Sequence, residues 1–94
     1  MRERTLKEIE TWRRIHLSVA AYAYEYLNDS IMSDEEYDRM SRQIDVSIDT
    51  DNEQMDKFFR TEFEPDTGMW IHKHPDKEGL KRIYMIKKNY LEKK

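Results

Sequence analysis

The sequence predicts a mainly α-helical fold, a compact bundle of about four helices around a helical hairpin. Two observations predict this fold class. Apolar residues recur at helical spacing in several long stretches, and residues 4–28 contain neither Gly nor Pro to interrupt the first of them. Residues 33–36 and 50–53 each have the pattern of a capping box, in which Ser or Thr is followed three residues later by Glu.

The first predicted helix covers residues 4–28 and is amphipathic. Leu17 and Tyr24 lie about a quarter turn from its apolar side at roughly 100° per residue. We therefore expect these two side chains to flank the core or to face another part of the molecule. The side of the helix that we expect to face the core consists of Ile9, Trp12, His16, Val19, Ala23, Tyr26 and Leu27.

The second helix follows a polar turn at residues 28–30, where short polar side chains compete for backbone hydrogen bonds. The Ser33 hydroxyl is expected to accept from the amide three residues on, while Glu36 reaches back toward it. The acidic first turn that follows suits the positive end of a helix dipole. We expect this helix to end near Ile44 or Asp45.

Two more helices complete the predicted bundle. The capping box at residues 50–53 opens a helix that runs toward Phe63. Residues 65–68 have turn chemistry, and residues 69–73 suit either a short extended segment or a packed loop. Residues 74–76 then read as the start of a last amphipathic helix near the basic C-terminus.

Composition predicts one domain, residues 1–94, in a reducing compartment. A hydrophobic share of 37% is low for a folded chain, but two Trp, three Phe and six Tyr are large enough to fill a small core. The absence of Cys excludes disulfides, thiolate metal sites and cysteine nucleophiles. Because the N-terminus is charged and no run of about 18 apolar residues occurs, we expect a cytoplasmic protein without membrane contact.

Charge is distributed unevenly along the chain. Residues 29–66 carry thirteen acidic and four basic residues, whereas residues 67–94 carry eight basic and three acidic residues. A basic tail can bind nucleic acid by releasing counterions from phosphates. The same pattern equally fits a solvated helix face or a partner for the acidic middle within the fold. The residues that would contact nucleic acid are Lys81, Arg82, Lys87 and Lys88.

Three residues at the start of the second helix form a candidate binding face. Asp34, Tyr37 and Asp38 are spaced at i, i+3 and i+4, which places two carboxylates and an aromatic ring on one side of a helix. Carboxylates can accept from ribose hydroxyls or a carboxamide, and tyrosine can stack on a cationic heterocycle. The alternative is that Tyr37 belongs to the core and both aspartates are simply solvated.

Residues 33–40, Ser-Asp-Glu-Glu-Tyr-Asp-Arg-Met, resemble the Asp-x-Glu-Tyr-Asp-Arg-Leu signature of the N-terminal NMN-binding helical subdomain of bacterial NAD-dependent DNA ligases. The similarity extends over residues 8–45, and Tyr24 occupies the position of a tyrosine ten residues before the first signature aspartate. The resemblance implies that Tyr24 and Tyr37 sandwich the nicotinamide ring of NMN or NAD. It also implies that Asp34 and Asp38 contact the surroundings of that ring.

The chain departs from the ligase pattern in ways that bear on function. Glu25 stands where the family usually has Tyr or His, and its charge would repel the phosphate of NMN. The lysine motif Lys-x-Asp-Gly of the ligase adenylation domain is absent, as is any glycine-rich phosphate loop, so we expect no enzyme activity. Three functions remain open. The first is a nucleotide-binding module, and the second is a protein-interaction module, such as a bacteriophage accessory or inhibitor protein in the host cytoplasm, that keeps residues 8–45 as a scaffold completed by residues 46–94. The third is a nucleic-acid accessory protein that uses the basic residues near the C-terminus.

Metal binding is not expected. His72 and His74 would project to one side of an extended segment, but no third ligand is evident. Residues 49–60 lack the glycine that a calcium loop requires. Trp70 is most simply explained as a core residue that seats the C-terminal half on the helices, the alternative being an exposed anchor for a partner.

Overall fold

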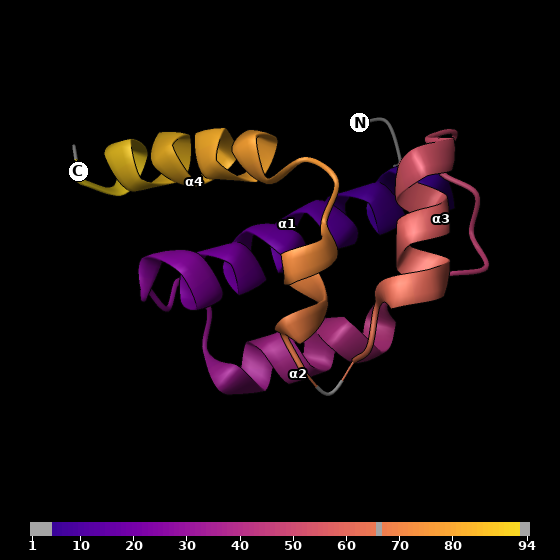
Figure 1. Cartoon of the computed structure of the whole chain (residues 1–94), viewed down its shortest axis with the longest axis horizontal. Coiled ribbons are helices and arrows are strands. Elements are labelled where there is room, and N and C mark those ends of the chain that lie inside the picture. The colour runs from indigo at the N-terminus through magenta and orange to yellow at the C-terminus, as the bar shows by residue number, and fades with distance from the viewer. Residues whose placement is uncertain (1–4, 66, 93–94) are drawn as a thin grey trace.

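The computed structural model describes residues 5–65 and 67–92, which form four α-helices and one short 3-10 helix (Figure 1). The described part of the chain contains no strand, so the predicted mainly α-helical bundle is confirmed. The elements are α1 (Leu6–Leu27), α2 (Asp34–Gln43), α3 (Glu53–Glu62), the 3-10 helix η1 (Met69–Lys73) and α4 (Lys77–Glu92).

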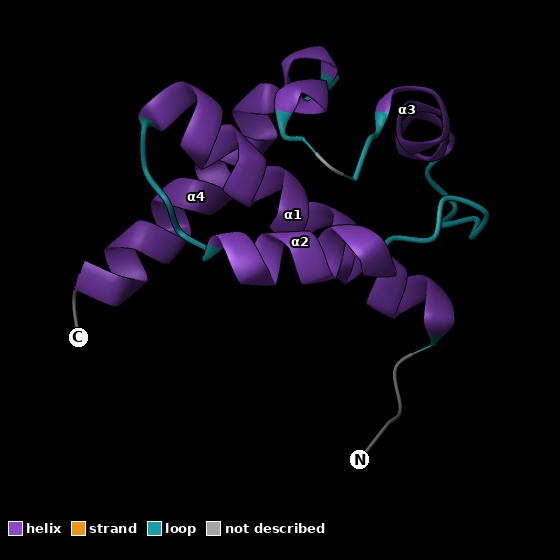
Figure 2. Ribbon diagram, turned by 90° about the horizontal axis from the view of Figure 1, so that it is seen from below, coloured by secondary structure: helices purple, strands orange, loops and turns teal. Residues whose placement is uncertain are grey.

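Helix α1 is the central element of the bundle. Helices α2 and α4 lie on opposite sides of it, and η1 crosses it between them (Figure 1). Helix α3 stands near the N-terminal end of α1, away from α4 in both views (Figures 1 and 2). The first half of α1 contacts α3 through Arg14 and Asp56, whereas the second half lines a cavity together with α2.

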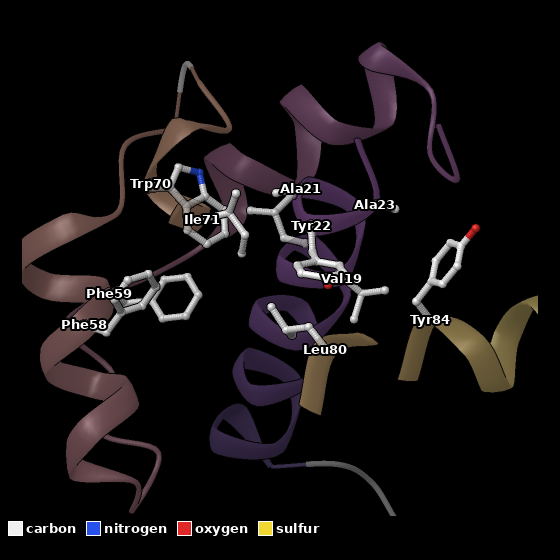
Figure 3. Packing of buried hydrophobic residues seen from close by; sticks show 11 residues of the cluster. Val19, Ala21, Tyr22, Ala23, Phe58, Phe59, Trp70, Ile71, Leu80 and Tyr84 are labelled. Carbon is white, nitrogen blue, oxygen red and sulfur yellow. The ribbon is translucent and has the colours of Figure 1, made fainter. Parts of the chain in front are cut away.

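The hydrophobic core lies where α1 meets α3, η1 and α4 (Figure 3). Phe58 and Phe59 approach from α3, Leu80 approaches from α4, and Trp70 of η1 packs against both phenylalanine rings. Trp70 is only 4% exposed, so its predicted role as a core residue is confirmed. The remaining buried residues of this cluster are Leu17, Val19, Ala21, Tyr22, Ala23, Ile71 and Tyr84.

The predicted core face of α1 was partly wrong. Val19 and Ala23 are buried as expected, but Trp12 is 42% exposed and Leu17 is fully buried. The buried face of the first half of the helix instead includes the charged residues Glu10 and Arg14. A search for apolar periodicity cannot find a face whose buried members are charged, because it assigns those positions to solvent.

The buried charged residues form one hydrogen-bonded network. The Arg14 guanidinium donates from Nε to Glu10 at 2.6 Å and from a terminal nitrogen to Asp56 at 2.7 Å. Its other terminal nitrogen donates to the backbone carbonyls of Asp45 and Ile48 at 2.9 and 3.1 Å. This one side chain therefore ties α1 to α3 and to the connection between α2 and α3.

The two carboxylates of this network have further donors. Asp56 accepts from the backbone amide of Thr50 at 3.0 Å and from its hydroxyl at 2.6 Å. Although burial by itself would raise it, the pKa of Asp56 is lowered to about 2 by the hydrogen bonds from Thr50 and Arg14. Glu10 accepts from the backbone amide of Asp45 at 3.1 Å. The network holds two carboxylates for one guanidinium and therefore carries net negative charge.

The segment at residues 69–73 is a 3-10 helix and not the extended segment that was one of the two predictions. The amide of Ile71 donates to the carbonyl of Gly68 at 3.2 Å, and the amide of His74 donates to the carbonyl of Ile71 at 3.0 Å. Trp70 and Ile71 are adjacent and both buried. A strand would send two adjacent side chains to opposite faces, whereas a helical turn lets both reach the same core.

Side-chain caps fix the starts of three helices. Thr5 accepts from the Glu8 amide at α1, and Ser33 accepts from the Glu36 amide at 3.1 Å at α2. Helix α3 is capped by Asn52, which accepts from the Met55 amide, and not by Thr50 as the predicted capping box implied. The side chain and amide of Thr50 bind Asp56 instead, which explains the later start of α3.

We expect Ser33→Ala to lower the free energy of unfolding by about 1 kcal/mol, because it removes the acceptor for the first-turn amides of α2. Urea denaturation of the two proteins measures the difference. Ser47→Ala is the comparison, because it also removes an exposed hydroxyl, whose 2.6 Å hydrogen bond to Asp45 lies outside the helices. A change below about 0.3 kcal/mol for Ser33→Ala would show that solvent caps α2 equally well.

Candidate functional site

A cavity of about 210 Å³ lies between the second half of α1, the start of α2 and the turn before η1. It contains every residue that the sequence assigned to a nucleotide site. The α1 side chains of Tyr24 and Glu25 form one wall, and the α2 side chains of Asp34, Tyr37 and Asp38 form another. The remaining lining residues are Ala20, Ala21, Ser30, Ile31, Met32, Thr67 and Gly68.

Tyr37 is the most firmly held of these side chains. Its hydroxyl donates to the backbone carbonyl of Thr67 and accepts from the indole nitrogen of Trp70, both at 3.2 Å. Burial raises the pKa of Tyr37 to about 12, so the phenol keeps its proton at neutral pH. These contacts fix the hydroxyl end of the ring, and the ring also packs against the core.

Tyr24 is much freer than Tyr37. Its side chain is 63% exposed, and it makes no ring contact with Tyr37 or with any other residue that the structure describes. The two tyrosines therefore line the same cavity without packing on each other. An exposed ring beside a fixed ring is an arrangement that can accept a flat ligand by a rotation of one side chain.

Asp34 and Asp38 lie exposed at the rim of the cavity in the first turns of α2. Neither carboxylate forms a hydrogen bond or an ion pair within residues 5–65 and 67–92. Both side chains are consequently available to accept from a ligand. Their predicted role in ligand contact is compatible with this position and stays a prediction.

Glu25 is held by a histidine that sequence reasoning did not connect with it. His72 Nε2 lies 3.0 Å from Glu25 Oε1, and His72 Nδ1 lies 2.8 Å from the hydroxyl oxygen of Tyr26. Since a carboxylate only accepts, His72 Nε2 donates to Glu25, and Nδ1 shares a second hydrogen bond with the hydroxyl of Tyr26. Glu25 and His72 are 47 positions apart, and no local pattern signals their pairing.

The two histidines considered as metal ligands, His72 and His74, are hydrogen-bonded to different residues. His72 binds Glu25, whereas His74 is buried and its Nδ1 accepts from the backbone amide of Asp76 at 3.0 Å. The described residues contain no group of three or more His, Cys, Asp or Glu side chains placed to hold a metal ion.

The basic residues of α4 do not form one uniform surface. Lys87 Nζ lies 2.8 Å from His16 Nδ1, and Lys88 forms an ion pair with Asp29 at 3.1 Å. Burial lowers the pKa of Lys87. Lys81 and Arg82 are exposed. Part of the predicted basic surface thus pairs with other residues of the same chain. The ion pair of Lys88 with Asp29 joins the basic C-terminal part to the acidic middle, which was one of the predicted alternatives.

Comparison of the chain with protein-family models, with curated proteins and with solved structures found no match. The likeness to the ligase subdomain therefore depends on the residues of the hairpin themselves. Among the described helices, not one combines the length and the apolar character that a membrane crossing requires.

Proposed function

We propose that the cavity between α1 and α2 binds the nicotinamide half of NMN or NAD. The observation that carries this proposal is the convergence of two tyrosines and three carboxylates, from two helices, on one cavity. Oxidised nicotinamide is a flat, cationic ring with a carboxamide. Tyrosine faces attract such a ring, and carboxylates can accept from the carboxamide and from ribose hydroxyls.

The size of the cavity limits how much of the ligand enters. At about 210 Å³ it is smaller than the roughly 300–1,000 Å³ of pockets that enclose drug-sized ligands. It suits a single ring with part of its ribose. In this proposal the nicotinamide ring enters, Tyr24 stacks over it, and the rest of the nucleotide stays outside.

The charge of the cavity orients the ligand. Glu25, Asp34 and Asp38 attract the positive ring and repel the phosphate. The phosphate is therefore expected to point to solvent, which reconciles Glu25 with nucleotide binding. The domain in this proposal recognises the nucleotide without catalysing a reaction on it.

Isothermal titration calorimetry with NMN, NAD⁺ and NADH tests the proposal. We expect NMN and NAD⁺ to bind and NADH to bind about tenfold more weakly, because its dihydronicotinamide ring is neutral and loses about 1.4 kcal/mol of electrostatic attraction. Gly68 provides a matched pair of variants, since a Cβ there would lie 3.6 Å from the Tyr37 hydroxyl and 3.9 Å from the Ala21 Cβ. Gly68→Ala should keep binding, whereas Gly68→Leu should fill the cavity and abolish it.

Absence of heat at millimolar NMN would reject the nucleotide site, as would equal binding by Gly68→Leu or Tyr37→Ala. That result would favour the alternative, a protein-interaction or phage accessory module that keeps the hairpin as a scaffold. Circular dichroism of each variant shows whether it is folded. The φ angle of −101° at Gly68 is open to any residue, so neither substitution there strains the backbone.

A further inference from the structure

Tyr26, His72 and Glu25 form a chain of hydrogen bonds that leads from an exposed phenol to a carboxylate. The Tyr26 hydroxyl oxygen lies 2.8 Å from His72 Nδ1, and His72 Nε2 lies 3.0 Å from Glu25 Oε1. The rings of Tyr26 and His72 are also in contact, with their centroids 5.0 Å apart. A nucleophile, a base and a group that orients the base, each within about 2.6–3.2 Å of the next, are the parts that nucleophilic catalysis uses.

The order of the three groups sets the direction of proton transfer. Because the Glu25 carboxylate can only accept, the single proton of a neutral His72 ring is held on Nε2. Nδ1 of that neutral ring is then the acceptor for the Tyr26 hydroxyl. When the ring takes the phenol proton, the imidazolium that forms is stabilised by the Glu25 carboxylate. His72 is therefore placed as a base, and Glu25 is the residue that positions it.

The phenol is accessible, whereas the carboxylate is largely shielded. Tyr26 is 43% exposed, and the side chains of His72 and Glu25 are 41% and 19% exposed. Neither Tyr26 nor His72 lines the cavity between α1 and α2, and only Glu25 belongs to both places. Reactions at Tyr26 can therefore be tested independently of nucleotide binding in that cavity.

We propose that Tyr26 is an activated nucleophile that accepts acyl groups from neutral activated esters. In this reaction the phenol oxygen forms a bond to the acyl carbon, and the bond from that carbon to the leaving alcohol oxygen breaks. The phenol proton passes to His72 Nδ1 and then to the leaving oxygen or to water. The negative charge of Glu25 disfavours acyl phosphates, because their charge lies next to the reacting carbon.

The probe is p-nitrophenyl acetate, and peptide mass spectrometry measures the rate of O-acetylation at each tyrosine. Tyr24 is the internal control, since it lies two residues away, is more exposed at 63% and has no histidine partner among the described residues. Exposure alone predicts faster acetylation of Tyr24. General-base assistance predicts that Tyr26 is acetylated at least about tenfold faster than Tyr24. Hydroxylamine removes acetyl groups from tyrosine but not from lysine, which identifies the product.

Three variants assign the effect to the hydrogen-bonded chain. His72→Phe removes the base and keeps an aromatic ring beside Tyr26, so the ratio of the two tyrosine rates should fall at least about tenfold. Glu25→Ala should lower the same ratio, because it removes the acceptor that holds the His72 proton on Nε2. His16→Phe is the matched control, since His16 is paired with Lys87, and it should leave the ratio unchanged.

The pH dependence of the ratio separates a base from a contact that only supports the fold. The general rise of phenol reactivity with pH affects both tyrosines and cancels in the ratio. In the wild-type protein the ratio should rise between about pH 5 and 8, where histidines titrate, and in His72→Phe it should stay flat. The charged groups around His72 are its partner Glu25 and its chain neighbour Lys73, which pairs with Glu62 at 3.5 Å.

Three results would overturn the proposal: no acetylation of Tyr26, acetylation of Tyr24 at an equal or higher rate, or a preference for Tyr26 that survives in His72→Phe. Each would leave the hydrogen-bonded chain with the role of holding η1 against α1. Circular dichroism shows whether each variant is folded. If a variant does not fold, the ratio in the wild-type protein and its pH dependence decide.

Discussion

Arg14→Met is expected to lower the free energy of unfolding by about 3–5 kcal/mol, the largest effect of any single substitution considered. The Arg14, Glu10 and Asp56 side chains are at most 4% exposed. Removing the guanidinium leaves two buried carboxylates without their cation. Met replaces most of the aliphatic volume, so the loss reflects uncompensated charge more than an empty space. Urea denaturation followed by circular dichroism measures it.

Arg82→Met is the matched control, because Arg82 is exposed and makes no ion pair with the described residues. We expect a change within about 0.5 kcal/mol for it. If Arg14→Met changed the free energy of unfolding as little as Arg82→Met, the carboxylates of Glu10 and Asp56 would be exposed to water and not buried. Partial recovery in Arg14→Met with Asp56→Asn would identify the unpaired carboxylate as the cause, since the double variant removes one buried charge.

The stability of the protein is expected to fall by up to about 3 kcal/mol as the pH is lowered from 6.5 to 4, through His74. Burial, with a smaller contribution from the charge of Lys77, lowers the pKa of His74 to about 4 against the opposing charge of Asp76. Between these pH values the unfolded chain binds a proton that the folded chain does not. Protonation would also put a hydrogen on Nδ1, which accepts from the Asp76 amide.

His74→Asn tests this prediction, because its side-chain oxygen can replace Nδ1 as the acceptor but does not titrate. Urea denaturation at pH 4, 5, 6 and 7 gives the free energy of unfolding at each pH. In the variant, this free energy should have lost most of its dependence on pH. A smaller slope of the same sign should remain from His16, whose pKa is lowered by burial and by the charge of Lys87. An unchanged slope in His74→Asn would exclude His74 as its origin. Asp56, whose pKa is lowered from 3.8 to about 2, contributes to the pH dependence mainly below pH 4.

Local patterns predicted the helices well, since periodicity and capping are properties of neighbouring residues. The start of α2 at Asp34, after its Ser33 cap, was predicted from four consecutive residues. The spacing of Asp34, Tyr37 and Asp38 likewise predicted that they would share a face, and all three line one cavity.

Interactions between distant residues were beyond this kind of prediction. The partners of Arg14 in α3 and in the connection before it are 31 to 42 positions away. The pairing of Glu25 with His72 similarly depends on how η1 crosses α1. Each is decided by packing, and a charged residue in a helix carries no local sign that it will be buried.

The hydroxyl of Tyr37 joins the cavity to the core, because it donates to Thr67 and accepts from the buried Trp70. The ring of Tyr37 therefore cannot rotate out of the cavity without breaking the hydrogen bond that its hydroxyl accepts from Trp70 of η1. The Tyr37 wall is therefore preorganised, so in the proposed complex little entropy would be lost in ordering it, and most of the ordering would fall on Tyr24. Because Tyr24 is 63% exposed, its ring is the part of the cavity that would adjust to the ligand in the proposed complex.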